Sequence, residues 1–179
     1  MKKIVLTYGL IAGAILAAMM FLTLPFHDKI GLDNGLILGY TSMVLAFLMV
    51  FFGVRAYRDN VAEGTVTFGR AFMVGLLITA IASICYVATW EILYYNFLPD
   101  FGEKYAAQAI EQARQSGASA AEIAKKTQEM AEWQVQYRNP VINIAYTLLE
   151  PLPVGLLFTV VSAGILSRKR RVEGATTAQ

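Results

Sequence analysis

The sequence predicts an all-α fold: a four-helix transmembrane bundle with an extracytoplasmic helical hairpin between the third and fourth spans. Composition supports this, because only 16% of the 179 residues are charged and 56% are hydrophobic. Soluble domains carry about 25% charged residues. The distribution supports it further, because four stretches of 16 to 23 residues contain no charged side chain. Such apolar stretches fit helices that cross a hydrocarbon core of about 30 Å.

The same composition excludes several classes of protein. A chain this apolar is not disordered, and a balance of 15 basic against 13 acidic residues is not that of a nucleic-acid binder. A single cysteine cannot hold a secreted domain together through internal disulfides. A soluble enzyme does not fit the four apolar stretches. The sequence therefore indicates a small polytopic membrane protein whose main surrounding is the lipid bilayer.

We expect four spans, at about residues 4–26, 35–54, 70–98 and 141–166. The first is retained rather than cleaved, because its apolar run is longer than the roughly 7–15 residues of a secretory signal. The third span contains Glu91, and the fourth is interrupted by Glu150 and two prolines. Residues 1–170 are expected to form one membrane domain, and 171–179 a short, disordered cytoplasmic tail.

The distribution of Lys and Arg orients the predicted bundle. With both termini in the cytoplasm, nine basic residues lie inside and six outside. Five of those six belong to the long segment between spans three and four, where the positive-inside bias counts for less. The sequence therefore predicts cytoplasmic termini and places residues 99–140 on the opposite side.

Small residues recur every fourth position on three of the predicted spans. Such stripes let helix backbones approach closely in lipid, where no hydrophobic force drives helices together. The three stripes are Gly9, Gly13 and Ala17; Ala71, Gly75, Thr79 and Ser83; and Gly155, Thr159 and Ala163. They predict tight helix packing, although small residues are also simply common in membrane helices.

The charged segment 100–137 predicts two helices joined by a short turn. Asp100 and Ser119 each precede a glutamate by three residues, which is the pattern of an N-cap with a capping box. Gly117 between the helices suits a C-terminal cap. The second helix carries an apolar face that includes Trp133. We expect this hairpin to fold onto the outer end of the bundle, or else to bind a partner or cap a ligand.

Two acidic residues lie at membrane depth, and no span contains a Lys or Arg that could neutralise them. Glu150 lies about 13 Å and Glu91 about 10 Å below the same outer surface, so antiparallel helices bring them to a similar level. The prolines after Glu150 break the helix and free backbone carbonyls. The predicted intramembrane polar site comprises Glu91, Glu150, Tyr40, Tyr94, Asn143, Tyr146 and Thr147. The competing interpretation is structural: a glutamate bonded to tyrosine that holds two helices in register.

Other candidate sites are weaker. His27 with Asp28 and Asp33 could begin a metal site, but one histidine among scattered carboxylates is usually a solvated loop. Cys85 is interpreted as a packing residue. Residues 64–71 superficially resemble a phosphate-binding loop but lack its lysine and its hydroxyl residue. The sequence therefore predicts no metal, no cofactor and no catalytic residue.

A set of short motifs runs along nearly the whole chain, about residues 1–170. They are Phe52-Gly53-Val54-Arg55-x-Tyr57-Arg58-Asp59, Gly64…Phe68-Gly69-Arg70-Ala71-Phe72…Gly75, Tyr86…Trp90, Pro99-Asp100-Phe101…Tyr105, Tyr137…Asn139-Pro140 and Leu149-Glu150-Pro151-x-Pro153-Val154-Gly155. In combination they resemble a family of bacterial membrane proteins catalogued as domain of unknown function 4199. The resemblance implies a four-span inner-membrane protein with residues 99–140 in the periplasm. It implies no activity, and Arg70 stands where the family often has lysine.

Three functions stay open on the sequence. The favoured one is a structural or accessory membrane protein that acts through a protein partner or as a homo-oligomer, with the 100–137 hairpin as the contact. The alternative is a small proton-coupled carrier or channel that uses Glu91 and Glu150. An intramembrane enzyme is least favoured, because two carboxyls are not a catalytic set. A carrier predicts a crevice that reaches both glutamates, and an enzyme predicts a lipid-like molecule beside them.

Overall fold

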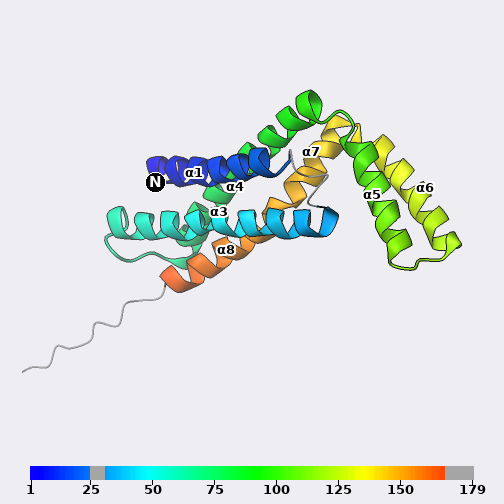
Figure 1. The fold of residues 1–179 in the computed structure, drawn as a ribbon. Coiled ribbons are helices and arrows are strands. Elements are labelled where there is room, and N and C mark those ends of the chain that lie inside the picture. The colour runs from blue at the N-terminus through cyan, green and yellow to red at the C-terminus, as the bar shows by residue number, and fades with distance from the viewer. Residues whose placement is uncertain (25–30, 168–179) are drawn as a thin grey trace, which may run out of the picture.

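The computed structural model of the chain describes residues 1–24 and 31–167, which fold into α-helices without a β-strand (Figure 1). The helices are α1 Lys2–Thr23, α3 Leu32–Asn60, α4 Phe68–Phe97, α5 Phe101–Gln115, α6 Ala120–Tyr137, α7 Pro140–Leu149 and α8 Pro151–Leu166. Four of the described segments are long and apolar enough to cross a membrane, namely Lys2–Thr23, Asn34–Asn60, Phe68–Phe97 and Pro140–Leu166. The prediction of an all-helical chain with four candidate spans is confirmed.

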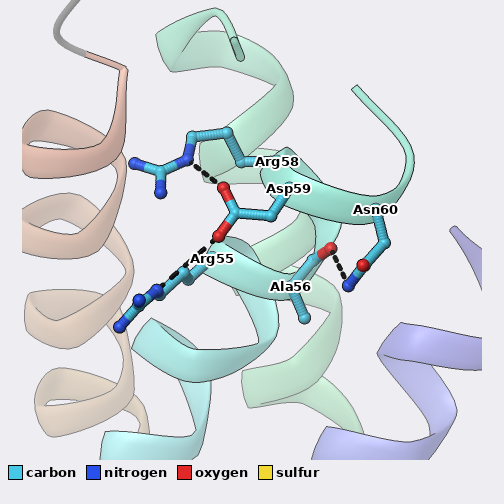
Figure 2. A network of polar contacts seen from close by, with 5 residues as sticks. All are labelled: Arg55, Ala56, Arg58, Asp59 and Asn60. Atoms are coloured by element: carbon cyan, nitrogen blue, oxygen red, sulfur yellow. Dashed lines mark hydrogen bonds and ion pairs between the residues drawn. The ribbon is translucent and has the colours of Figure 1, made fainter. Parts of the chain in front are cut away.

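Helix α3 continues past the predicted end of the second span as far as Asn60. Figure 2 shows why the charged residues at this end suit a helix: Arg58 Nε lies 2.7 Å from one carboxylate oxygen of Asp59, and Arg55 Nε lies 3.6 Å from the other. Asn60 Nδ2 also donates to the Ala56 carbonyl at 3.0 Å. Pairing between residues four positions apart supports helical backbone. The charged residues therefore end the apolar run without ending the helix.

The candidate spans pack around the pair formed by α3 and α4. Helix α1 contacts both of them, and α8 contacts the same two helices. Leu16 of α1, Phe47 of α3 and Ile78 of α4 are almost completely buried where these helices meet. In lipid, such side chains stabilise the fold through close packing, because the surrounding acyl chains are equally apolar.

The predicted stripe on α1 packs directly against α4. A Cβ atom at Gly9 would lie 2.8 Å from Ile81 Cβ, and one at Gly13 would lie 2.6 Å from Cys85 Cβ. No side chain can occupy either position without moving α1 away from α4. The interpretation of Cys85 as a packing residue agrees with this contact.

The stripes on α4 and α8 pack against each other. Thr79 Oγ1 lies 3.3 Å from the Gly155 carbonyl oxygen and 3.2 Å from Thr159 Oγ1. A Cβ atom at Gly155 would collide with the Thr79 methyl group, and one at Gly75 would lie 3.0 Å from Thr159 Cγ2. The prediction of tight helix packing through small residues is therefore confirmed for this pair of helices.

Helices α5 and α6 lie side by side and extend away from the α4–α7 corner (Figure 1). Gly117 has a φ of +81°, which a residue with a Cβ rarely adopts. Its N–H donates to the Arg114 carbonyl, and the Ala118 N–H donates to the Ala113 carbonyl. This is the pattern of a Schellman cap. The predicted C-terminal cap at Gly117 is therefore confirmed.

The two predicted N-caps of this segment differ in outcome. The Ser119 N–H donates to Glu122 Oε2 at 2.7 Å and the Glu122 N–H donates to Ser119 Oγ at 3.3 Å, which completes the predicted capping box. Asp100 precedes α5, but its side chain makes no capping hydrogen bond. Its backbone has φ −95° and ψ 9°, whereas a capping residue needs an extended backbone to aim its side chain at the first turn. The predicted capping box at Asp100 is therefore wrong.

The last candidate span consists of two helices that meet at Glu150. Asn139 caps α7 by accepting a hydrogen bond from the Val141 N–H at 3.0 Å. The hydrogen-bonded ladder ends at Leu149, and α8 begins at Pro151, as the sequence predicts. Glu150 itself keeps helical dihedrals, φ −70° and ψ −55°. The span therefore continues in direction but lacks backbone hydrogen bonds next to the carboxyl group.

Candidate functional site

Glu150 forms a hydrogen bond with a tyrosine of another span. The Tyr86 hydroxyl, on α4, donates to Glu150 Oε2 at 2.6 Å. The two residues are 64 positions apart in the sequence, so the bond joins α4 to the α7–α8 junction. Glu150 makes no ion pair within the described residues. A carboxylate can accept about four hydrogen bonds, so this one leaves most of its acceptor capacity for other groups.

Asn143 connects three helices beside this pair. Its side chain is fully buried and accepts hydrogen bonds from Trp90 Nε1 at 2.9 Å and from Thr147 Oγ1 at 3.3 Å. Its Nδ2 donates to the Tyr137 carbonyl at 3.5 Å. The amide thus fixes the end of α6 and the face of α4 relative to α7. The amide can be buried here because both its oxygen and its nitrogen have hydrogen-bond partners.

A crevice of about 710 Å³ opens between the α5–α6 pair and helices α1, α3, α4 and α7. Its volume lies within the range of about 300–1,000 Å³ that is typical of small-molecule sites. Eight aromatic side chains line it, including Trp90 and Trp133, which are the two tryptophans of the chain. Glu150 and Tyr86 contribute a carboxylate and a phenol to its wall. An apolar cavity with a few placed polar groups is the usual form of a ligand site.

A cluster of aromatic rings, called the aromatic stack below, attaches α5 and α6 to α4 at one edge of the crevice, with Trp90 and Phe101 edge to face. The ring centroids of Trp90 and Phe101 lie 4.8 Å apart, and those of Trp133 lie 5.0 Å from Tyr105 and 4.6 Å from Tyr137. Trp133 is half-buried in this stack. Burial raises the pKa of the Tyr137 hydroxyl above its usual value of 10.0, so this group remains a hydrogen-bond donor at neutral pH.

The structure brings together most of the residues of the predicted polar site. Glu150, Tyr40, Tyr146 and Thr147 line the crevice, and Asn143 lies directly behind Thr147. That these residues act as a functional site remains a prediction.

Glu91 and Tyr94 do not line the crevice. Trp90 faces it, and the next residue of an α-helix points about 100° away. Within the described residues, Glu91 Oε1 is buried without a hydrogen-bond partner. Tyr94 packs into the aromatic stack instead, 5.9 Å from Trp90 and 5.6 Å from Tyr137 between ring centroids. No hydrogen bond joins Glu91 to Glu150 in the part of the chain that the structure describes.

Two residues of the site were not selected from the sequence. Tyr86 and Trp90 lie one helical turn apart and present a phenol and an indole to the same crevice. Their spacing of four residues was a usable signal, because such a pair shares one face of a helix. The other candidate, His27 with Asp28, lies outside the described residues, and so does the side chain of Asp33.

A family model described as "Protein of unknown function (DUF4199)" matches residues 7–168 of the chain. The chain belongs to this family. The match covers most of α1 and all of α3 to α8, and every residue of the crevice named above lies within it. No curated protein and no solved structure matches the chain significantly.

Proposed function

We propose that this DUF4199 protein is an accessory protein of the bacterial inner membrane that binds an amphiphilic molecule in the crevice. Its four candidate spans form a bundle with both termini in the cytoplasm, and the helical hairpin of residues 99–140 lies in the periplasm. The distribution of Lys and Arg supports this orientation. The observation that carries the binding role is the crevice itself, which the α5–α6 pair covers with aromatic side chains.

The depth of the crevice favours an amphiphile over a water-soluble ligand. Its walls include side chains of all four candidate spans, among them Leu16, Met43 and Tyr86. They also include side chains of the polar helices α5 and α6, such as Gln112 and Lys126. A molecule bound there meets acyl-chain surroundings at one end and a polar surface at the other. Amphiphilic molecules match that gradient.

Association through the α5–α6 pair is a second candidate for the accessory role. Val135 of α6 is 74% exposed, although Trp133 and Tyr137, two positions before and after it, pack into the aromatic stack. Deleting residues 100–137 should then release a copurifying protein or reduce the homo-oligomer to monomers. A chain that stays monomeric and without a protein partner before deletion would refute this role.

A carrier that uses both glutamates is not favoured by the geometry. Such a carrier needs one continuous aqueous crevice that reaches Glu91 and Glu150, and the crevice reaches only Glu150 among the described residues. Glu91 lies on another side of α4.

Filling the crevice tests the binding role. Gly39 lines the crevice and has no atom within 4 Å of an added Cβ, so we expect the ring of Gly39→Phe to occupy ligand space. Gly164 has equally open surroundings but lies outside the crevice, so Gly164→Phe is the matched control. A neutral bromododecyl maltoside should quench Trp90 and Trp133 saturably in wild type and in Gly164→Phe. Undiminished saturable quenching in Gly39→Phe would refute binding in the crevice.

Cysteine labelling tests the proposed orientation. In a Cys85→Ser background, an impermeant thiol reagent applied to spheroplasts should label Ser116→Cys in the turn between α5 and α6. It should leave Thr176→Cys unlabelled until the membrane is opened. Labelling of Thr176→Cys from outside would reverse the orientation.

A further inference from the structure

We propose that the amphiphile bound in the crevice carries a cationic alkylammonium head, which lies against Glu150 and the aromatic rings around it. This inference rests on the proposed binding role and names the chemistry of the ligand. Three independent features of the crevice support it: its charge, its aromatic rings and its apolar wall.

The charge of the crevice comes from two residues. Of the described residues that line it, Glu150 is the one acidic residue and Lys126 the one basic residue. Glu150 is bonded to Tyr86 but forms no ion pair within the described chain. A carboxylate at membrane depth is costly unless a cation or several hydrogen bonds accompany it. A ligand cation is the partner that this carboxylate lacks.

Lys126 does not supply that partner. It lies on α6 eleven residues before Tyr137, which is about 16 Å along the helix from the end that packs near Glu150. Its position leaves Glu150 as the one group that can carry a negative charge at that end of the crevice, and a bound cation favours the ionised carboxylate. A cationic head is therefore attracted to the Glu150 end, and an anionic head is repelled from it.

Aromatic rings surround the same end. The Tyr86 hydroxyl donates to Glu150, and Tyr40 and Tyr137 line the same crevice. The indole of Trp90 is held beside them by its hydrogen bond to Asn143. Alkylammonium groups bind to the faces of such rings through cation–π attraction, which strengthens where water is excluded. A carboxylate combined with several aromatic rings therefore selects a cation over a neutral donor.

The remaining wall suits an apolar chain. Met19 and Met20 of α1 and Met43 of α3 also line the crevice. Methionine side chains are flexible and polarisable, so they adapt to a chain without a fixed shape. A small ammonium ion alone would leave most of the 710 Å³ and this whole wall unoccupied. The geometry thus points to a head and a chain in one molecule.

The test compares three heads on one bromododecyl chain: trimethylammonium, maltoside and sulfate. The full chain is held in a non-ionic amphipol, and quenching of Trp90 and Trp133 reports occupancy of the crevice that both line. The ammonium probe should bind about tenfold tighter than the maltoside probe, as expected for one desolvated cation–π and ion-pair contact. Glu150→Gln should abolish this preference, whereas Glu91→Gln, the other intramembrane carboxyl, should keep it.

Equal binding of the three heads to wild type would overturn the inference while leaving the binding role intact. So would an unchanged preference for ammonium in Glu150→Gln. The wild-type comparison needs no variant, so it decides the matter even if Glu150→Gln does not fold. Absence of saturable quenching by every probe would instead overturn the proposed function. Displacement of the ammonium probe by phosphatidylethanolamine, but not by phosphatidylglycerol, would identify a lipid as the source of the ammonium head. If neither lipid displaces the probe, the source is a free single-chain amine.

Discussion

Replacing Asn143 by leucine tests the network that holds α4, α6 and α7 together. The change keeps the volume of the side chain but removes the acceptor for two hydrogen bonds, from Trp90 Nε1 and from Thr147 Oγ1. Thr147 loses little, because its hydroxyl can turn to the carbonyl one helical turn before it. Trp90 is 8% exposed, so its N–H is left without a partner among packed side chains.

The expected cost comes mainly from that unpaired donor, because the other bond that is lost, from Asn143 Nδ2 to the Tyr137 carbonyl, is long at 3.5 Å. Leaving a buried donor unsatisfied costs about 1–3 kcal/mol, while hydrogen bonds between membrane helices average about 0.6 and reach about 1.7 kcal/mol. We therefore expect Asn143→Leu to lower the free energy of unfolding by about 1–2 kcal/mol. The same change in a Trp90→Phe background should cost about 1 kcal/mol less, because the donor is no longer present.

Reversible unfolding in mixed micelles of dodecyl maltoside and dodecyl sulfate measures this difference. Far-ultraviolet circular dichroism is the appropriate signal, since it does not depend on the tryptophan that one variant removes. The four proteins of the double-mutant cycle are wild type, Asn143→Leu, Trp90→Phe and the combination. An equal cost of Asn143→Leu in both backgrounds would show that the Trp90–Asn143 bond contributes nothing to stability, and the reasoning would fail.

Three further predictions concern a helix cap, its pH dependence and the small residues. Ser119→Ala should destabilise the first turn of α6 by about 1 kcal/mol, seen as faster amide hydrogen exchange there. The hydrogen bond from the Ser119 N–H holds the pKa of Glu122 below its usual value of 4.5. Protection of that turn should therefore be complete above about pH 4.5 and be lost as the pH falls through the lower folded-state pKa; protection that persists at pH 2 would contradict this. Gly155→Val should destabilise the chain by about 1–3 kcal/mol through its clash with Thr79, whereas Gly164→Val, with open surroundings, should cost much less; equal melting temperatures for the two variants would refute the packing argument.

The helices could be predicted because their signals are local. Apolar length identifies the four candidate spans, Gly117 identifies a turn that needs positive φ, and Ser119 with Glu122 identifies an N-cap within four residues. Arg55, Arg58 and Asp59 lie within α3, so loss of apolar character does not mark the end of a helix. Asp100 shows a limit of motif reading, since a cap depends on backbone dihedrals that the residue type alone does not determine.

The pairing within the site could not be predicted for a different reason. Helix α4 is apolar around most of its circumference, so nothing in its sequence tells which face meets α7. Glu91 and Trp90 are neighbours in the sequence but point about 100° apart, and only the packing of α4 against α7 decides which one reaches the crevice. The bond from Tyr86 to Glu150 spans 64 residues and depends on that same rotation.

The junction at Glu150 lacks backbone hydrogen bonds that stiffen the rest of the last span. Pro151 and Pro153 have no N–H group, so two backbone hydrogen bonds that resist bending are already missing there. On one side, α8 is fixed to α4 by the contacts of Thr159 and Gly155; on the other, Asn143 ties α7 to α4 and α6. Bending is therefore concentrated at the carboxyl-bearing residue itself. The residue that we propose as the ligand contact therefore lies at the point where the last span bends most easily.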